Sequence, residues 1–115
     1  MFEPGSLEVI NRSVLFIRPL QPFSDWLAGF DPTDASGDVL QDSDVYLLPE
    51  YDTVQQMENW LKKNFDSIFM DQLNNWYIDE KMWPKNRTLK MFKEWFDYSF
   101  ASMVKDTKTS QIEKD

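Results

Sequence analysis

The sequence predicts an α+β domain in which a small three-stranded sheet is covered on one face by helices. Short segments rich in β-branched and aromatic residues predict strands, and one long segment with helical periodicity predicts the covering helix. The 115 residues include five Trp and nine Phe, enough to fill a core. A chain of this size forms a single domain, 1–115, and we expect flexible tails at 1–8 and 106–115.

The first half of the chain predicts a strand and a short helix. A strand is expected over residues 9–18, and Pro19 closes it because proline lacks a backbone donor. A helix is expected over 22–29, since Pro22 suits a first helical turn and apolar residues follow at helical spacing. Residues 31–44 combine turn formers with acids and indicate an exposed loop.

The longest expected element follows a second short strand, 45–51, with the sequence VYLLPEY. The spacing predicts one helix over 53–76, where Thr53 and Gln56 are placed as a capping box. Its apolar residues recur mostly at three- and four-residue steps: Val54, Met57, Trp60, Leu61, Phe65, Ile68, Phe69, Leu73 and Trp76.

A third helix and a last strand complete the expected order, strand, helix, strand, helix, helix, strand. The helix is expected over 87–98, with Asn86 or Thr88 as its cap. Alternating residues predict the strand over 98–105. A purely helical domain is the main alternative, if the short strands are not strands.

Charge and composition limit the function. The net charge is −8, which disfavours nucleic-acid and anionic membrane surfaces, so we expect neither partner. The whole excess lies in residues 1–52, which carry ten acids and two arginines, against ten acids and ten bases in 53–115. The chain has no cysteine and its start does not resemble a signal peptide, which predicts a cytoplasmic protein.

The sequence argues against an enzyme. Without His and Cys, the commonest general base and the best thiol nucleophile are absent, and we find no phosphate loop or nucleophile elbow. Residues 31–42, DPTDASGDVLQD, fail as a calcium loop because positions five and six are Ala35 and Ser36. We therefore expect no metal and no cofactor.

Two alternatives to a binding protein stay open. The first is a metal-dependent hydrolase. Glu50, Asp79 and Glu80 match a pattern in which carboxylates bind magnesium, and Lys81 would stabilise the charge that develops in the reaction. The other is a small-molecule binding protein with a pocket between the long helix and the sheet.

The leading hypothesis is an interaction protein that binds another protein. Arginine and tryptophan are frequent interface anchors, so the expected surface consists of Arg12, Arg18, Trp83, Lys85 and Arg87. Trp83 has two interpretations, a cover for the core, which is favoured, or an exposed anchor. Its segment, WYIDEKMWPKNR at 76–87, is interpreted first as a joint between helices.

Four segments carry a family resemblance: NRSVLFIRPLQPFSDWL, VYLLPEY, WYIDEKMWPKNR and FKEWFDYSFASMVKD. Together they resemble a family of small bacterial proteins that pairs NR…RP.QPF..W with a later W..DE..WP.NR….F..WF. The resemblance covers most of residues 11–106. It implies a bacterial origin and a compact stand-alone domain. That family has no established activity, so the resemblance implies no catalytic or binding residue.

Overall fold

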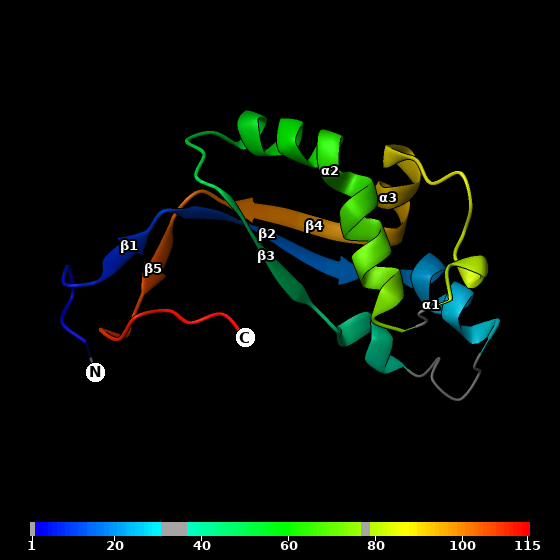
Figure 1. Cartoon of the computed structure of the whole chain (residues 1–115), viewed down its shortest axis with the longest axis horizontal. Coiled ribbons are helices and arrows are strands. Elements are labelled where there is room, and N and C mark those ends of the chain that lie inside the picture. The colour runs from blue at the N-terminus through cyan, green and yellow to red at the C-terminus, as the bar shows by residue number, and fades with distance from the viewer. Residues whose placement is uncertain (1, 31–36, 77–78) are drawn as a thin grey trace.

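The computed structural model describes residues 2–30, 37–76 and 79–115. The chain is a mixed α+β fold (Figure 1). Its elements in order are β1 (Glu8–Ile10), β2 (Arg12–Pro19), α1 (Gln21–Ala28), the 3-10 helix η1 (Gly37–Gln41), β3 (Asp44–Pro49), α2 (Val54–Asn74), the 3-10 helix η2 (Glu80–Met82), α3 (Leu89–Trp95), β4 (Phe96–Ala101) and β5 (Val104–Asp106).

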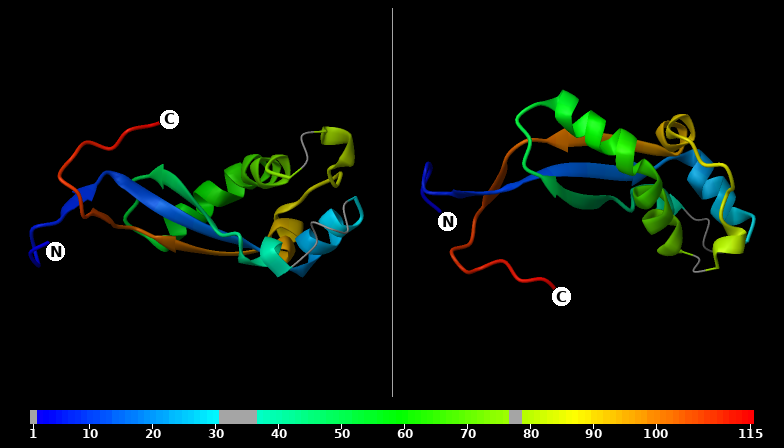
Figure 2. Two further views of the ribbon diagram at one scale, coloured as in Figure 1. Left: turned by 90° about the horizontal axis from the view of Figure 1, so that it is seen from below. Right: turned by 45° about the horizontal axis from the view of Figure 1, so that its top comes forward.

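The strands form two antiparallel sheets. The larger has the order β3-β2-β4, and β1 pairs with β5 in a separate two-stranded ribbon at one end of the molecule (Figures 1 and 2). The expectation of one three-stranded sheet was therefore incomplete. The predicted strands 9–18 and 98–105 are each interrupted, at Asn11 and at residues 102–103. Each continues into the ribbon, where Glu8 pairs with Asp106.

The helix predictions hold for α1 and α2 and fail in part for α3. The capping box at the start of α2 is confirmed, because the Thr53 side chain accepts a hydrogen bond from the Gln56 backbone while Gln56 bonds back. Helix α3 begins after Thr88, whose hydroxyl accepts from the Met91 backbone at 3.1 Å. It ends at Trp95 because β4 begins at once, without a loop. No helix in the described ranges is long and apolar enough to cross a bilayer.

Most of the core lies between α2, α3 and one face of the sheet. The register places Leu15 beside Tyr46 and Phe100, so these side chains share a face, which we call the covered face. Aromatic rings join the helices to it: Phe69 of α2 lies 6.1 Å from Phe92 and 5.2 Å from Phe96, centroid to centroid. The exposed loop expected at 31–44 falls partly outside the described residues, and its later part forms η1.

Ser13 ties three parts of the fold together at the point where the ribbon leaves the sheet. Its side chain is completely buried. Its hydroxyl oxygen accepts a hydrogen bond from the Tyr51 backbone N–H at 2.9 Å and lies 3.3 Å from the carbonyl oxygens of Tyr51 and Ser102. The hydroxyl therefore joins β2 to the connection before α2 and to the bend between β4 and β5.

Replacement of Ser13 should destabilise the fold. We expect Ser13→Ala to lower the free energy of unfolding by about 1–3 kcal/mol, because the part-buried N–H of Tyr51 loses its acceptor. Ser99→Ala, an exposed serine of β4, is the matched control and should change it by less than about 0.5 kcal/mol. Urea unfolding measures both, and equal effects of the two substitutions would contradict the assigned role of Ser13.

Candidate functional site

The five residues expected to form one surface do not all lie together. Arg12 and Arg18 belong to β2, where they are six residues and therefore about 20 Å apart on the same face. Trp83, Lys85 and Arg87 lie in the connection between η2 and α3. Figures 1 and 2 show this connection at the end of the molecule away from the ribbon.

Trp83 points inward, so the interpretation of this residue as a cover for the core is confirmed. Its side chain is 8% exposed and packs with the core cluster. The guanidinium of Arg87 lies 5.9 Å from the centroid of the Trp83 ring. Arg87 also donates to the carboxylate of Asp66 on α2 at 2.7 and 3.3 Å and to the carbonyl of Pro84 at 2.9 Å. These contacts stabilise the chain between two helices and leave Lys85 as the exposed base.

The carboxylates of the hydrolase alternative do not share a site. Glu50 precedes α2, whereas Asp79 and Glu80 follow it, and the 21 residues of α2 rise about 30 Å along its axis. Figures 1 and 2 place the two ends of this helix far apart. Asp79 instead caps η2, since its side chain accepts from the Lys81 backbone at 3.0 Å. Across 2–30, 37–76 and 79–115, the structure holds no group of three acids arranged for a metal ion.

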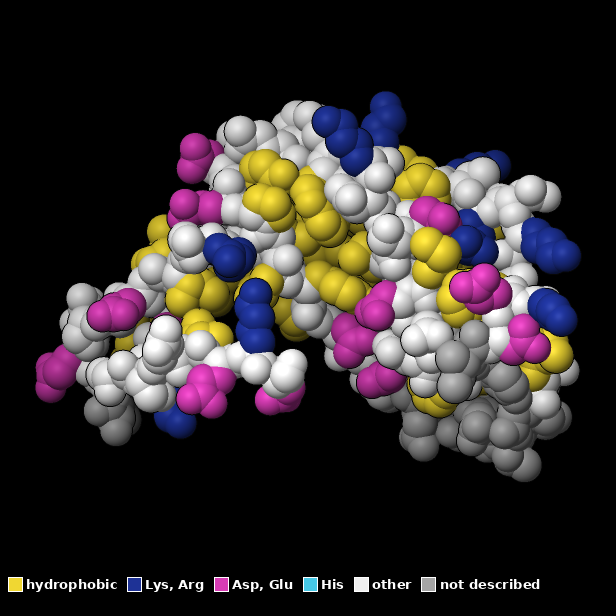
Figure 3. Space-filling view, viewed as in Figure 1, with side chains coloured by type: hydrophobic (Ala, Val, Ile, Leu, Met, Phe, Trp, Pro, Cys, Tyr) yellow, Lys and Arg dark blue, Asp and Glu magenta, His cyan; other side chains and the backbone are white. Residues whose placement is uncertain are grey.

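A small cavity lies beside the first half of α2, and no strand residue lines it. Figure 3 shows hydrophobic side chains in a hollow beside α2. This cavity has a volume of about 230 Å³ and is lined by Tyr51, Gln56, Asn59, Trp60 and Lys63. Ligand pockets usually measure about 300–1,000 Å³. The small-molecule alternative gains no support from this cavity.

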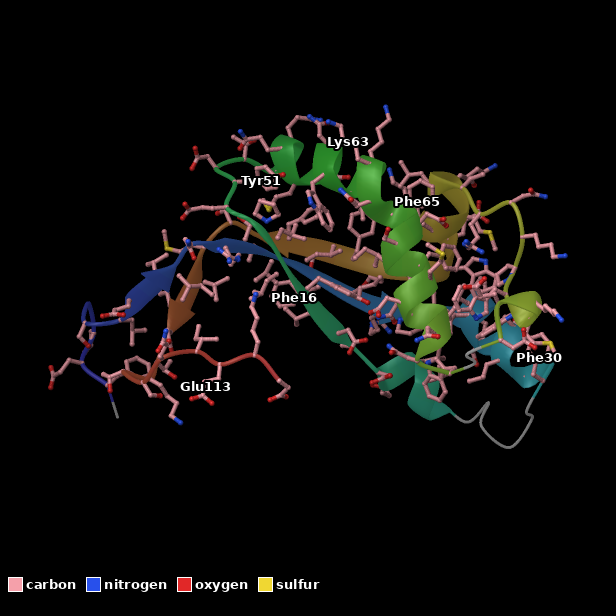
Figure 4. The ribbon with its side chains drawn as sticks, in the orientation of Figure 1. Phe16, Phe30, Tyr51, Lys63, Phe65 and Glu113 are labelled. Atoms are coloured by element: carbon pink, nitrogen blue, oxygen red, sulfur yellow. The ribbon has the colours of Figure 1, made fainter. Side chains whose placement is uncertain are left out.

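The sheet face opposite α2 exposes several apolar side chains, although Val14 on it is buried and Ser99 is polar, and we call it the open face. Phe16 is paired with Val45, and the neighbouring pair is Val14 with Leu47. Phe16, Val45 and Leu47 are 43%, 56% and 51% exposed. In Figure 4, Phe16 lies on the opposite side of the sheet from Lys63 and Phe65 of α2. Three adjacent large apolar side chains are thus left in contact with solvent.

A basic residue and a cavity lie at each end of the open face. At one end, Arg18 forms a 3.4 Å ion pair with Asp97, and both residues line a cavity of about 300 Å³ beside Phe16. At the other end, Arg12 lines a groove of about 590 Å³ that also includes Leu47. The Arg18 pair is exposed and contributes on the order of 0–1 kcal/mol, so a partner's carboxylate could replace Asp97.

The apolar run at residues 14–17 predicts a strand that is largely buried on both faces in its middle, and this prediction misses the open face. The signal was present in VYLLPEY, where Val45 and Leu47 alternate with Tyr46 and Leu48. Such alternation puts one pair on each face of a sheet. All four residues are apolar, so the pattern does not say which face the helices cover.

A polar cluster between β3 and α2 is internally satisfied. The hydroxyl of Tyr46 donates to the carboxylate of Asp71 at 2.6 Å. The amide of Gln72 donates to Tyr46 at 2.8 Å and to Asp44 at 2.7 Å. Burial, and then the hydrogen bond to Asp71, raise the pKa of Tyr46 above its ordinary value. The cluster joins α2 to an edge strand.

Arg87 and Lys85 are a matched pair for a test of the joint before α3. We expect Arg87→Ala to lower the free energy of unfolding by about 1.5–3 kcal/mol, because a charged hydrogen-bond network and the cover over Trp83 are lost. Lys85→Ala should change it by less than about 0.5 kcal/mol. Equal losses for the two variants in urea unfolding would show that Arg87 has no special role.

Tyr46 should give the fold a pH dependence in alkali. Above about pH 10 the phenol ionises in the unfolded chain while the folded state keeps its proton, so the unfolded state is favoured as pH rises. The stability difference between the native chain and Tyr46→Phe should shrink by about 1.4 kcal/mol per pH unit above pH 10. Urea unfolding of both proteins from pH 8 to 11 measures this difference. If the two plots of unfolding free energy against pH are parallel, Tyr46 is not the cause of the pH dependence.

A comparison with protein-family models, with curated proteins and with solved structures finds no match to this chain. The candidate site is therefore defined by the side chains alone. Those side chains are the apolar residues of the open face, Phe16, Val45 and Leu47, with Arg12 and Arg18 at its two ends.

Proposed function

We propose that this chain is a binding protein without catalytic activity that holds a short apolar segment of another protein on its open face. One observation carries the proposal: Phe16, Val45 and Leu47 are adjacent and each is about half exposed. Contiguous apolar surface on a folded protein is typical of a binding site, whereas apolar side chains that lie singly need no explanation.

The size of the open face favours a short partner segment. Three strands of six paired residues have a geometric footprint of about 280 Å², taking 3.3 Å per residue and 4.8 Å between strands, and this footprint includes the buried Val14 and the polar Ser99. A standard interface between two globular proteins buries about 800 Å² on each partner. The open face thus fits one extended or helical segment better than the flat surface of a second domain.

The ends of the open face favour acidic groups on that segment. Arg12 and Arg18 lie at opposite ends, and Arg12 forms no ion pair with the parts of the chain that the structure describes. The partner segment we propose therefore has apolar residues in its middle and a carboxylate near one end or both.

The lack of cysteine agrees with a reducing compartment. Together with the family resemblance, it leads us to propose that the protein acts in the bacterial cytoplasm.

Selection from a random peptide display library tests the proposal. Selected peptides should be apolar with flanking acids, and the double variant Phe16→Ser/Leu47→Ser should weaken their binding at least tenfold by fluorescence anisotropy. The control is Val54→Ser, which removes an apolar side chain that is 61% exposed on α2 and outside the open face. Peptides that bind the double variant and the native chain equally would exclude the open face.

A further inference from the structure

The C-terminal segment, residues 107–115, lies beside one end of the open face. In Figure 1 it leaves β5 and runs back beneath the sheet, and in Figure 3 a notch separates its end from the body of the molecule. The groove of about 590 Å³ lies between the two. Its lining comes from both sides: Ile10, Asn11, Arg12 and Leu47 from the strands, and Gln111, Ile112 and Lys114 from the segment.

The segment has the chemistry of the partner proposed above. Ile112 is its one large apolar residue and is 57% exposed, facing the same groove as Leu47. Glu113 and Asp115 supply carboxylates beside it. Leu47 on one wall and Ile112 on the other both expose apolar surface, so closing the groove removes apolar surface from water.

We propose that residues 107–115 are an intramolecular strap that closes on the open face and competes with the partner segment. This inference rests on the proposed function only for the competition, because closure itself involves this chain alone. Burial of Ile112 against Leu47 favours the closed state, and ordering of the strap backbone opposes it. The strap is therefore displaced by a segment that contacts more of the open face.

Charge sets the balance between the open and closed states. Arg12 and Lys114 both line the groove, so their like charges repel as the strap approaches. Salt screens this repulsion and also the attraction between Arg12 and the neighbouring Glu113 and Asp115, so a single charge change tests the balance more directly than ionic strength does. Lys114→Glu would replace the repulsion by attraction to Arg12 and should favour closure further.

Disulfide trapping tests closure without any partner. The native chain has no cysteine, so the paired variant Leu47→Cys/Ile112→Cys carries one possible intramolecular bond. We expect it to oxidise at least tenfold faster, as a monomer, than the control pair Val54→Cys/Ile112→Cys, whose first site lies on α2. Added Lys114→Glu should raise the rate of the first pair alone. Equal rates for the two pairs would overturn the strap.

Peptide binding tests competition and separates the two proposals. Ile112→Asp should tighten binding of an open-face peptide by about threefold or more, because the fraction of open molecules rises. Thr109→Asp adds the same charge outside the groove and should leave binding unchanged. If peptides bind Ile112→Asp and the native chain equally, the strap is wrong and the binding function stands. If the disulfide forms quickly but no peptide binds, the binding function is wrong and closure stands.

Discussion

The pairing of β2 with a strand on each side is the constraint on which the rest of the structure depends. Every residue of β2 from Arg12 to Pro19 is paired with β3, with β4 or with both. Its side chains alternate, so Leu15 and Ile17 enter the core while Phe16 and Arg18 face the other way. The register of β2 therefore decides at once which residues α2 must cover and which remain on the open face. A slip of one residue would exchange the two sets.

The placement of the helices explains why one face of the sheet is left open. Helix α2 spans the covered face, and α3 packs beside it through a cluster of aromatic rings, including Phe69, Phe92 and Phe96. In the parts of the chain that the structure describes, neither helix reaches the opposite face (Figure 2). A sheet with one solvated face ordinarily carries polar residues there. Phe16, Val45 and Leu47 depart from that rule, which is why we propose a binding role for them.

The candidate site could be predicted from the sequence only in part. Arg12 and Arg18 are interaction-prone residues near strand ends, and both do lie at the limits of the open face. Trp83 and Arg87 belong to the same residue types but lie in the joint before α3, where Arg87 covers Trp83 and pairs with Asp66. Residue type does not distinguish Arg12 and Arg18 from Trp83 and Arg87. An arginine that binds a partner and an arginine that bonds to its own chain can have the same neighbours in the sequence.

The sequence by itself determined the elements whose causes are local. Thr53 and Gln56 fix the start of α2, Pro22 lies in the first turn of α1, and Thr88 caps α3. Tertiary structure decided the rest: the bend at Asn11 that sends β1 into a separate ribbon, the end of α3 at Trp95, and the face that helices cover. These features depend on partners distant in the chain, such as Ser13 with Tyr51 and Ser102. The periodicity of a sequence shows which residues share a face of a helix or strand, but not what packs against that face.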